Sequence, residues 1–151
     1  MNPQAHRLAS GDPAAFAELY DACADRLHHY LVARLGSRTD ADDVLQETFV
    51  RLARTRKKLS TVENLVAYVF AMARNEAIRL AERRAREGRT QAVASPEDLF
   101  RQPGGDALQA IETVEWVAAS LARLSPDLRE IVELKIYADV TFREIGELTG
   151  L

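Results

Sequence analysis

Apolar residues recur at intervals of three and four along most of this chain, and no segment alternates apolar with polar residues. The clearest stripe follows Asp12-Pro13, a pair that favours a helix start because Asp caps free amides and Pro is tolerated at the first helical position. The stripe runs from Phe16 to Leu31, and Gly36 is expected to end the helix. Only 7 Gly and 5 Pro occur among 151 residues, which also favours helix. The pattern therefore predicts an all-α protein.

Two more helices are predicted in the first half of the chain. One begins near Thr39, a plausible cap, and carries acids in its first turn, where the helix dipole favours negative charge. The next follows a basic, turn-like segment and runs to Arg86. Ser60 and Glu63 have capping-box spacing at its start.

Residues 88–106 lose the helical period and collect glycine and proline, a composition typical of a linker. Beyond them the pattern predicts a helix over residues 108–124, one capped at Ser125, and a last one from Thr141 to Gly150. The apolar side chains expected inside the middle helix of these three are Leu128, Ile131, Val132, Leu134 and Ile136. We therefore expect two small helical domains, at residues 1–87 and 107–151, joined by a flexible linker.

Charge is distributed unevenly along the chain, although the net charge is only −3. Residues 1–50 carry 4 basic and 8 acidic side chains, residues 51–89 carry 11 and 4, and residues 90–151 carry 5 and 11. A basic middle between acidic flanks indicates one surface for a polyanion and others for basic partners. Ordinary solvated helix faces are the alternative interpretation.

Several classes of protein are excluded by what the sequence lacks. The single cysteine, Cys23, excludes an internal disulfide and a cysteine-cluster zinc site, and His6, His28 and His29 have no companions at metal-ligand spacing. No glycine-rich phosphate loop or nucleophile elbow occurs. The start does not resemble a signal peptide, and no apolar run approaches a membrane span. We expect a cytoplasmic protein that is not an enzyme and holds no metal or cofactor.

In the segment at residues 40–52 the apolar side chains are expected to face the core, and four other side chains share one exposed helix face. These are Asp43, Gln46, Glu47 and Val50, at positions i, i+3, i+4 and i+7. Acids and an amide beside an exposed valine favour a docking surface for a basic partner, against the alternative of a solvated acidic face. The segment resembles the core-binding region of bacterial sigma factors. That resemblance implies that the four residues bind the clamp helices of the largest RNA polymerase subunit.

Residues 63–78 resemble the promoter-melting helix of the same family, in which Ala-Arg-Asn is a recurring signature, here at residues 73–75. Tyr68 stands where the family usually has Trp, and Arg79 where it often has Asp. The arginines of this helix offer cations to phosphates, and the polar loop before it suits an extruded base. The resemblance implies that the −10 promoter element is bound by Lys57, Lys58, Ser60, Asn64, Tyr68, Arg74, Asn75, Arg79 and Arg83. For the loop residues, plain solvation is the alternative.

Residues 124–130 and 137–150 look like the start of the sigma domain that reads the −35 element. Thr141 to Gly150 would be the first helix of a helix-turn-helix, with Gly150 at its turn. The second helix, which enters the major groove, would follow Leu151. We therefore expect a sigma domain without its recognition helix, through truncation, trimming or natural fragmentation.

Together the resemblance runs from about Asp12 to Leu151 and identifies the chain as a sigma-70-family factor of the extracytoplasmic-function (ECF) type. It implies a protein that directs core RNA polymerase to promoters, recognises and melts the −10 element and, if completed, reads the −35 element. Its implied partners are core polymerase, promoter DNA and an anti-sigma factor. One alternative is a sigma-like protein that titrates an anti-sigma factor, which would be expected to lose the basic helix. The other is a generic helix-turn-helix regulator, which leaves the acidic face unexplained.

Overall fold

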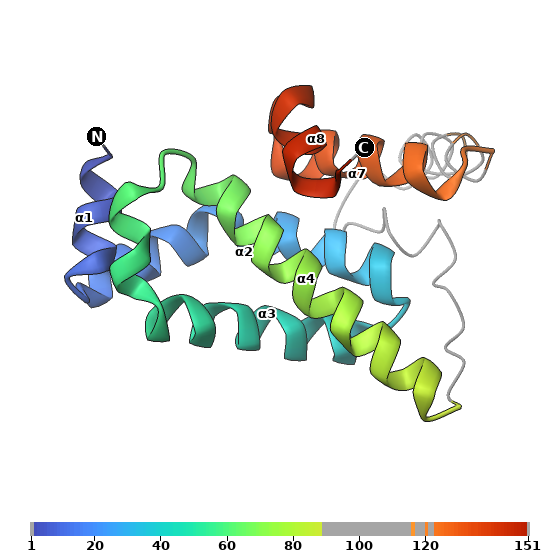
Figure 1. Cartoon of the computed structure of the whole chain (residues 1–151), viewed down its shortest axis with the longest axis horizontal. Helices are drawn as coiled ribbons and strands as arrows, with labels where there is room; N and C mark the ends of the chain where they lie inside the picture. Colours follow the sequence, from blue (N-terminus) through green and yellow to red (C-terminus); the bar gives the residue numbers. More distant parts are fainter. Residues whose placement is uncertain (1, 89–115, 117–119, 121–122, 151) are drawn as a thin grey trace, which may run out of the picture.

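The computed structural model describes residues 2–88, 116, 120 and 123–150, and its regular elements there are all helical (Figure 1). The elements are α1 (Pro3–Ala9), α2 (Pro13–Leu35), α3 (Arg38–Arg54), the 3₁₀ helix η1 (Arg56–Thr61), α4 (Leu65–Arg86), α7 (Pro126–Ala138) and α8 (Phe142–Thr149). The prediction of an all-α protein is confirmed. The predicted linker and the predicted helix over residues 108–124 lie largely outside the described residues. The proposed domain boundaries stay a prediction.

Helix α2 begins and ends where its sequence signals predict. The Asp12 carboxylate accepts from the Ala14 amide at 3.0 Å, which satisfies one of the free donors at the helix start. Gly36 adopts a left-handed conformation with φ of 70°, and its amide donates to the Val32 carbonyl at 2.9 Å. Glycine adopts that backbone conformation without a Cβ penalty, so the helix ends sharply there.

Two predicted helix starts are displaced along the chain. Helix α3 is capped by Ser37 rather than by Thr39, because the Ser37 hydroxyl accepts from the Asp40 amide at 3.2 Å. The predicted capping box at Ser60 is wrong, since Ser60 still lies in η1 and its hydroxyl donates to a carbonyl of that turn. Asn64 caps α4 instead, accepting from the Ala67 amide at 3.1 Å. Helix α1 was not predicted at all.

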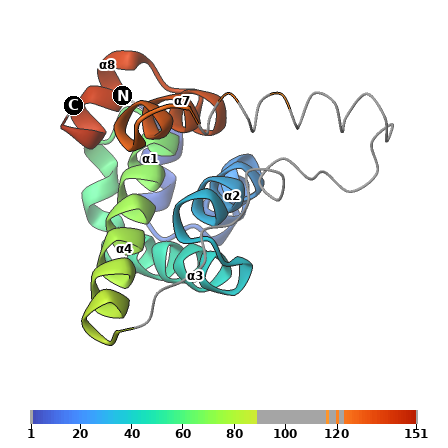
Figure 2. The same cartoon turned by 90° about the vertical axis from the view of Figure 1, so that its right-hand side faces the viewer.

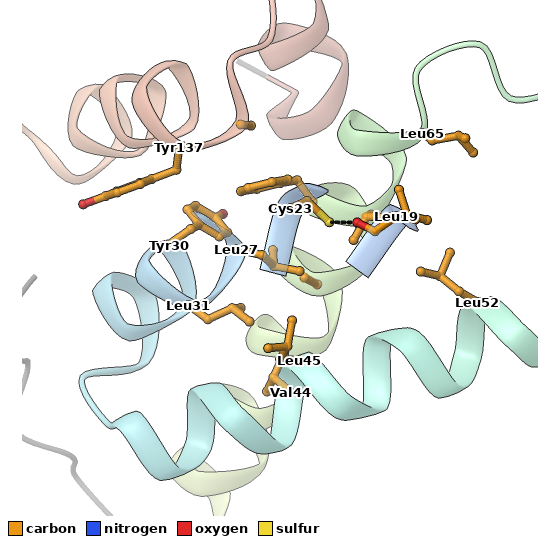
Figure 3. Close-up of a cluster of buried hydrophobic side chains, with 14 of the residues drawn as sticks. Leu19, Cys23, Leu27, Tyr30, Leu31, Val44, Leu45, Leu52, Leu65 and Tyr137 are labelled. Atoms are coloured by element: carbon orange, nitrogen blue, oxygen red, sulfur yellow. Dashed lines mark hydrogen bonds between the residues drawn. The ribbon is translucent and has the colours of Figure 1, made fainter. Parts of the chain in front are cut away.

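The core lies where α2 packs against α3 on one side and α4 on another, and α1 packs against η1 (Figures 1 and 2). Leucines from α2 and α3 point toward each other inside it, among them Leu27 and Leu45 (Figure 3). The Tyr30 ring of α2 lies 5.6 Å from the Phe70 ring of α4, and both are fully buried. This packing holds α3 and α4 in fixed positions and leaves the outer face of α3 exposed.

Helices α7 and α8, called here the C-terminal pair, lie against the bundle, with α7 beside α2 and α4 (Figures 1 and 2). The prediction that Leu128 and Ile136 lie inside is wrong, because their exposed fractions are 52% and 50%. The face of α7 that is buried instead contains Glu130, Glu133, Leu134 and Tyr137. Burying an acid is costly unless it is paired, and arginines of α2 and α4 supply partners for these two acids.

Candidate functional site

The four predicted docking residues of α3 share one solvent-facing side of the helix. Asp43 and Gln46 are exposed, Val50 is 41% exposed, and Glu47 is half-exposed with an ion pair of 3.3 Å to Arg51. The opposite side of α3 is buried in the core through Ala41, Val44, Leu45, Thr48 and Leu52. The set Asp43, Gln46, Glu47 and Val50 is called the docking face below.

Other charged residues near the docking face hold the helices together. Asp40 in the first turn of α3 is buried and forms an ion pair with Arg84 of α4. An oxygen of the Asp42 carboxylate lies 2.8 Å from the Nε2 atom of His28 in α2. These contacts tie the start of α3 to both neighbouring helices. The acids near the start of α3 therefore differ in their surroundings: Asp40 is buried and paired with another helix, whereas Asp43 is exposed and can meet a partner.

A groove of about 580 Å³ runs between α3 and α4, beside the docking face. Asp43 and Glu47 line it from α3, and Arg79 and Arg83 line it from α4. Arg79 forms an ion pair of 2.8 Å with Glu76 of its own helix. Two of the residues predicted to bind DNA thus lie next to those predicted to bind polymerase.

The lysines predicted to contact DNA lie on η1, just before α4. Lys57 and Lys58 are exposed, while Ser60 is half-buried and donates to the Lys57 carbonyl at 3.2 Å. Buried Leu59 anchors the turn between them. The result is a short basic edge next to Asn64, the cap of α4.

A second cavity, of about 480 Å³, separates the first turns of α4 from α8. Asn64 and Tyr68 line it from α4, and Glu144, Glu147 and Leu148 line it from α8. The Asn64 side-chain amide donates to the Glu144 carboxylate at 2.6 Å. The polar edge that was predicted to hold a base is thus bonded to an acid of the same chain.

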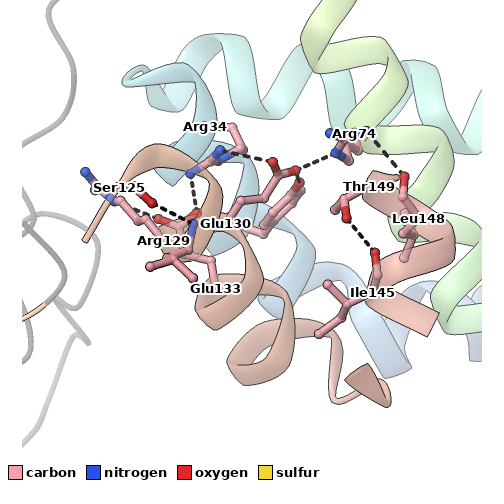
Figure 4. Close-up of polar contacts among 11 residues, drawn as sticks. Arg34, Arg74, Ser125, Arg129, Glu130, Glu133, Ile145, Leu148 and Thr149 are labelled. Atoms are coloured by element: carbon pink, nitrogen blue, oxygen red, sulfur yellow. Dashed lines mark hydrogen bonds and ion pairs between the residues drawn. The ribbon is translucent and has the colours of Figure 1, made fainter. Parts of the chain in front are cut away.

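Arg74 of α4 is also engaged by the C-terminal pair (Figure 4). Its guanidinium forms an ion pair with Glu130 of α7 and donates to the Leu148 carbonyl of α8 at 3.4 Å. The hydrogen bond to Glu130 raises the pKa of Arg74. Glu130 also accepts from the Tyr30 hydroxyl at 3.3 Å and lies 3.8 Å from Arg34 of α2. The Nε and Nη1 atoms of Arg74 are thus both bonded to groups of the C-terminal pair.

The nine predicted DNA-binding residues therefore fall into separate places. Arg79 and Arg83 lie in the groove with α3, the lysines and Ser60 lie on η1, and Asn64, Tyr68 and Arg74 face α7 and α8. Asn75 is exposed. Sequence reasoning missed Glu130 and Glu144 as partners of these residues. The excess of acidic side chains in residues 90–151 was the available signal for such contacts. Composition alone does not identify the basic residues that these acids contact.

No group of acids, histidines or cysteines in the described ranges could hold a metal ion. Among those same residues, no helix is long and apolar enough to cross a membrane.

Comparison with known proteins agrees with this geometry. Residues 19–87, from the first half of α2 to the end of α4, match the family described as sigma-70 region 2. The ECF RNA polymerase sigma factor BldN of Streptomyces coelicolor is 27% identical over 95% of this chain, which spans 55% of BldN. The sigma factor CarQ of Myxococcus xanthus is 29% identical over 96% of this chain and 82% of CarQ. The ECF sigma factor RpoE of Cereibacter sphaeroides is 28% identical over 93% and 77%. No solved structure matches.

These matches define a helical transcription factor rather than an enzyme. Residues 19–87 thus form a sigma-70 region 2 domain, and the chain is similar over nearly its whole length to extracytoplasmic-function sigma factors.

Proposed function

We propose that this chain directs core RNA polymerase to promoters and helps to open them at the −10 element. The observation that carries the proposal is the region 2 match over residues 19–87, since that range contains both the docking face and the basic helix α4. The function places the protein in the cytoplasm, where its polymerase acts.

The polymerase contact is assigned to the docking face. Two carboxylates and an amide on one side of α3 suit a basic partner helix, and the exposed Val50 adds apolar contact area. The helix beneath them is fixed by the core and by the Asp40–Arg84 ion pair. A partner would therefore meet a rigid surface, which lowers the entropic cost of binding.

The −10 contact is assigned to η1 and the outer face of α4. Exposed Lys57 and Lys58 can neutralise phosphates, which gives affinity without sequence preference. Asn64 and Tyr68 offer a polar edge and an aromatic ring next to one cavity, and an unstacked base needs both. Arg79 and Arg83, in the adjoining groove, extend the basic track toward the docking face.

The C-terminal residues 107–151 are assigned to −35 recognition once a recognition helix completes the helix-turn-helix, in which α8 is the bracing helix. Its Thr141 cap carries a complete capping box with Glu144, and Gly150 ends it in a left-handed conformation with φ of 74°. An anti-sigma protein is proposed as a further partner on the strength of the family resemblance.

Reconstitution with core polymerase tests the proposal. The chain should co-purify with core enzyme and support transcription from a subset of promoter templates, whereas a protein that only titrates an anti-sigma factor would do neither. Arg79→Ala and Arg83→Ala should each lower the salt dependence of binding to melted promoter DNA by about one counterion. Failure to bind core enzyme would refute the polymerase assignment. Unchanged salt dependence would remove these two arginines from the DNA site.

A further inference from the structure

The short 3₁₀ helix η1, which carries Lys57 and Lys58, has little packing of its own. Leu59 is its one buried residue, and a 3₁₀ helix has poorer hydrogen-bond geometry than an α-helix. The positions of the exposed side chains on either side of Leu59 therefore depend on the element that packs against η1. That element is α1, which lies beside η1 at the end of the bundle far from the last turn of α4 (Figure 1).

Helix α1 connects η1 to the beginning of α2. Leu8 of α1 is fully buried, in the same core cluster as Leu59. On the exposed side of α1, Arg7 forms ion pairs with Asp12 at 3.0 Å and with Glu18 at 2.9 Å. Because exposed ion pairs contribute little to stability, the buried contact through Leu8 carries most of this attachment.

A hydrogen bond also joins α1 to the chain just before α4. The Oδ1 atom of Asn2 accepts from the Gln4 amide at 3.0 Å and caps α1. The Nδ2 atom of the same side chain donates to the Glu63 carbonyl at 3.3 Å. Glu63 immediately precedes Asn64, which caps α4 and is proposed to offer a polar edge to a base. Asn2 thus links the start of α1 to the backbone that carries this group.

The turn between α1 and α2 accommodates a side chain of η1. Gly11 has a φ of 86°, a left-handed conformation that residues with a Cβ rarely adopt. A Cβ atom at Gly11 would lie 3.3 Å from Nε of Arg56, the first residue of η1. The Arg56 guanidinium also donates to the Ala53 carbonyl of α3 at 3.2 Å. Glycine at this turn therefore leaves room for the first side chain of η1.

From these contacts we propose that α1 and the turn after it position η1 for base recognition, with Asn2, Leu8 and Gly11 as the positioning residues. They act through η1 and Asn64 rather than by contact with DNA, so the proposal rests on the proposed function of those groups. All three precede residues 19–87, the range that matches sigma-70 region 2. Groups that read a base need support that holds them to within a fraction of an ångström, and α1 provides that support here.

Loss of folded protein and displacement of η1 have different effects on DNA binding. Destabilisation lowers the fraction of competent protein, which weakens binding to every oligonucleotide by the same factor. The ratio of the dissociation constants for a mismatched and a preferred sequence, called here the discrimination ratio, is then unchanged. Displacement of η1 moves the groups that contact bases, and only base contacts distinguish one sequence from another. A fall in the discrimination ratio therefore reports positioning rather than stability.

The test uses the whole chain bound to core RNA polymerase. The preferred −10 sequence is selected from a randomised pool of single-stranded DNA, and dissociation constants are measured for that sequence and for its single-base mismatches. Asn2→Ser keeps a hydroxyl that can cap α1 but is too short to reach the Glu63 carbonyl. Leu8→Ala removes the buried contact of α1.

The third variant, Gly11→Ala, places a Cβ against Arg56 and strains the backbone. Its matched control is Gly88→Ala, because Gly88 has a similar φ of 74° but no atom within 4 Å of an added Cβ. The control therefore introduces the same kind of backbone strain at a position where no neighbouring group is displaced.

Asn2→Ser, Leu8→Ala and Gly11→Ala should each lower the discrimination ratio by about threefold or more, and Gly88→Ala should leave it within about twofold of the parent. If Leu8→Ala fails to fold, the other two variants decide the outcome. Unchanged ratios in Asn2→Ser and Gly11→Ala would overturn the positioning role and leave the proposed function standing. An equal fall in Gly88→Ala would also overturn it. A parent complex that discriminates among no bases would refute base recognition by η1 and Asn64, and the positioning role with it.

Discussion

Arg34, in the last turn of α2, donates at 2.6 Å to Glu133 of α7, a carboxylate that is only 1% exposed. Arg129, one turn earlier in α7, donates to the other Glu133 oxygen at 2.9 Å. The acid is thus held between an arginine of its own helix and one from the distant N-terminal bundle. This arrangement lets α7 turn an acidic face toward the bundle and pack there.

Arg34→Ala should destabilise the packing of α7. Removing one partner of a buried ion pair typically costs roughly 3–5 kcal/mol, and the loss here should fall below that because Arg129 still pairs with Glu133. Urea denaturation followed by circular dichroism measures the change. As a control, Arg143→Ala removes an arginine whose side chain is 91% exposed and should shift stability by less than about 0.5 kcal/mol. Equal stability of the two variants would contradict the role given to Arg34.

Replacing Asp43, Gln46 and Glu47 together with alanine should weaken binding to core polymerase by about tenfold or more, with the helical fold retained. The three side chains point away from the buried side of α3, so their loss leaves the core intact. Binding is measured by titrating labelled protein with core enzyme. Asp21→Ala/Asp25→Ala, at exposed positions of α2, is the matched control and should bind normally. Unchanged binding of the triple variant would remove the docking face from the polymerase interface.

Tyr68→Ala should weaken binding to single-stranded −10 DNA, and Tyr68→Phe should largely retain it. Stacking of one base on an aromatic ring contributes about 1–3 kcal/mol, and phenylalanine keeps the ring while removing only the hydroxyl. Tyr68 is half-buried at the cavity wall, so its ring has one accessible face. Competition between oligonucleotides on the polymerase complex measures the effect. Equal losses in both variants would indicate that the hydroxyl, rather than the ring, makes the contact.

Cys23 should react slowly with thiol reagents in the folded protein. Burial raises the pKa of its thiol to about 11, and the Sγ atom donates to the Leu19 carbonyl at 3.1 Å. At pH 8 only roughly one thiol in a thousand would be ionised, and the thiolate is the reactive form. Labelling followed by absorbance should accelerate on adding urea through the unfolding transition. Rapid labelling of the native protein at pH 8 would contradict the burial of this side chain.

Several features of the fold and site are local and could be predicted from the sequence. Asp12 and Gly36 bound α2 because capping depends on backbone groups within a few residues. The same holds for Ser125 before α7 and Thr141 before α8, whose side chains accept from amides three residues ahead. The exposure of the docking face also follows from helix periodicity alone, since the apolar side of α3 must be the buried one.

Local signals were ambiguous at the start of α4. Ser60 and Glu63 have the spacing of a capping box, yet Asn64 makes the cap because the chain runs as a 3₁₀ turn through Thr61 and is extended at Val62. Several polar residues there can each cap a helix, so sequence alone does not select one. The choice depends on where the buried Leu59 and Leu65 anchor the chain.

Helix periodicity and capping signals were enough to predict that this chain is helical, where α2, α7 and α8 begin, and which face of α3 is exposed. Contacts between distant helices, in contrast, determine that α7 buries Glu130 and Glu133 instead of Ile136. They also bring Arg74 and Asn64 against acids of the C-terminal pair. The physical reason is the separation of the partners. Arg34 and Glu133 stand 99 positions apart, and Asn64 and Glu144 stand 80 apart. Helix periodicity fixes which residues share a face, but the charge that makes burial of an acid tolerable comes from another helix.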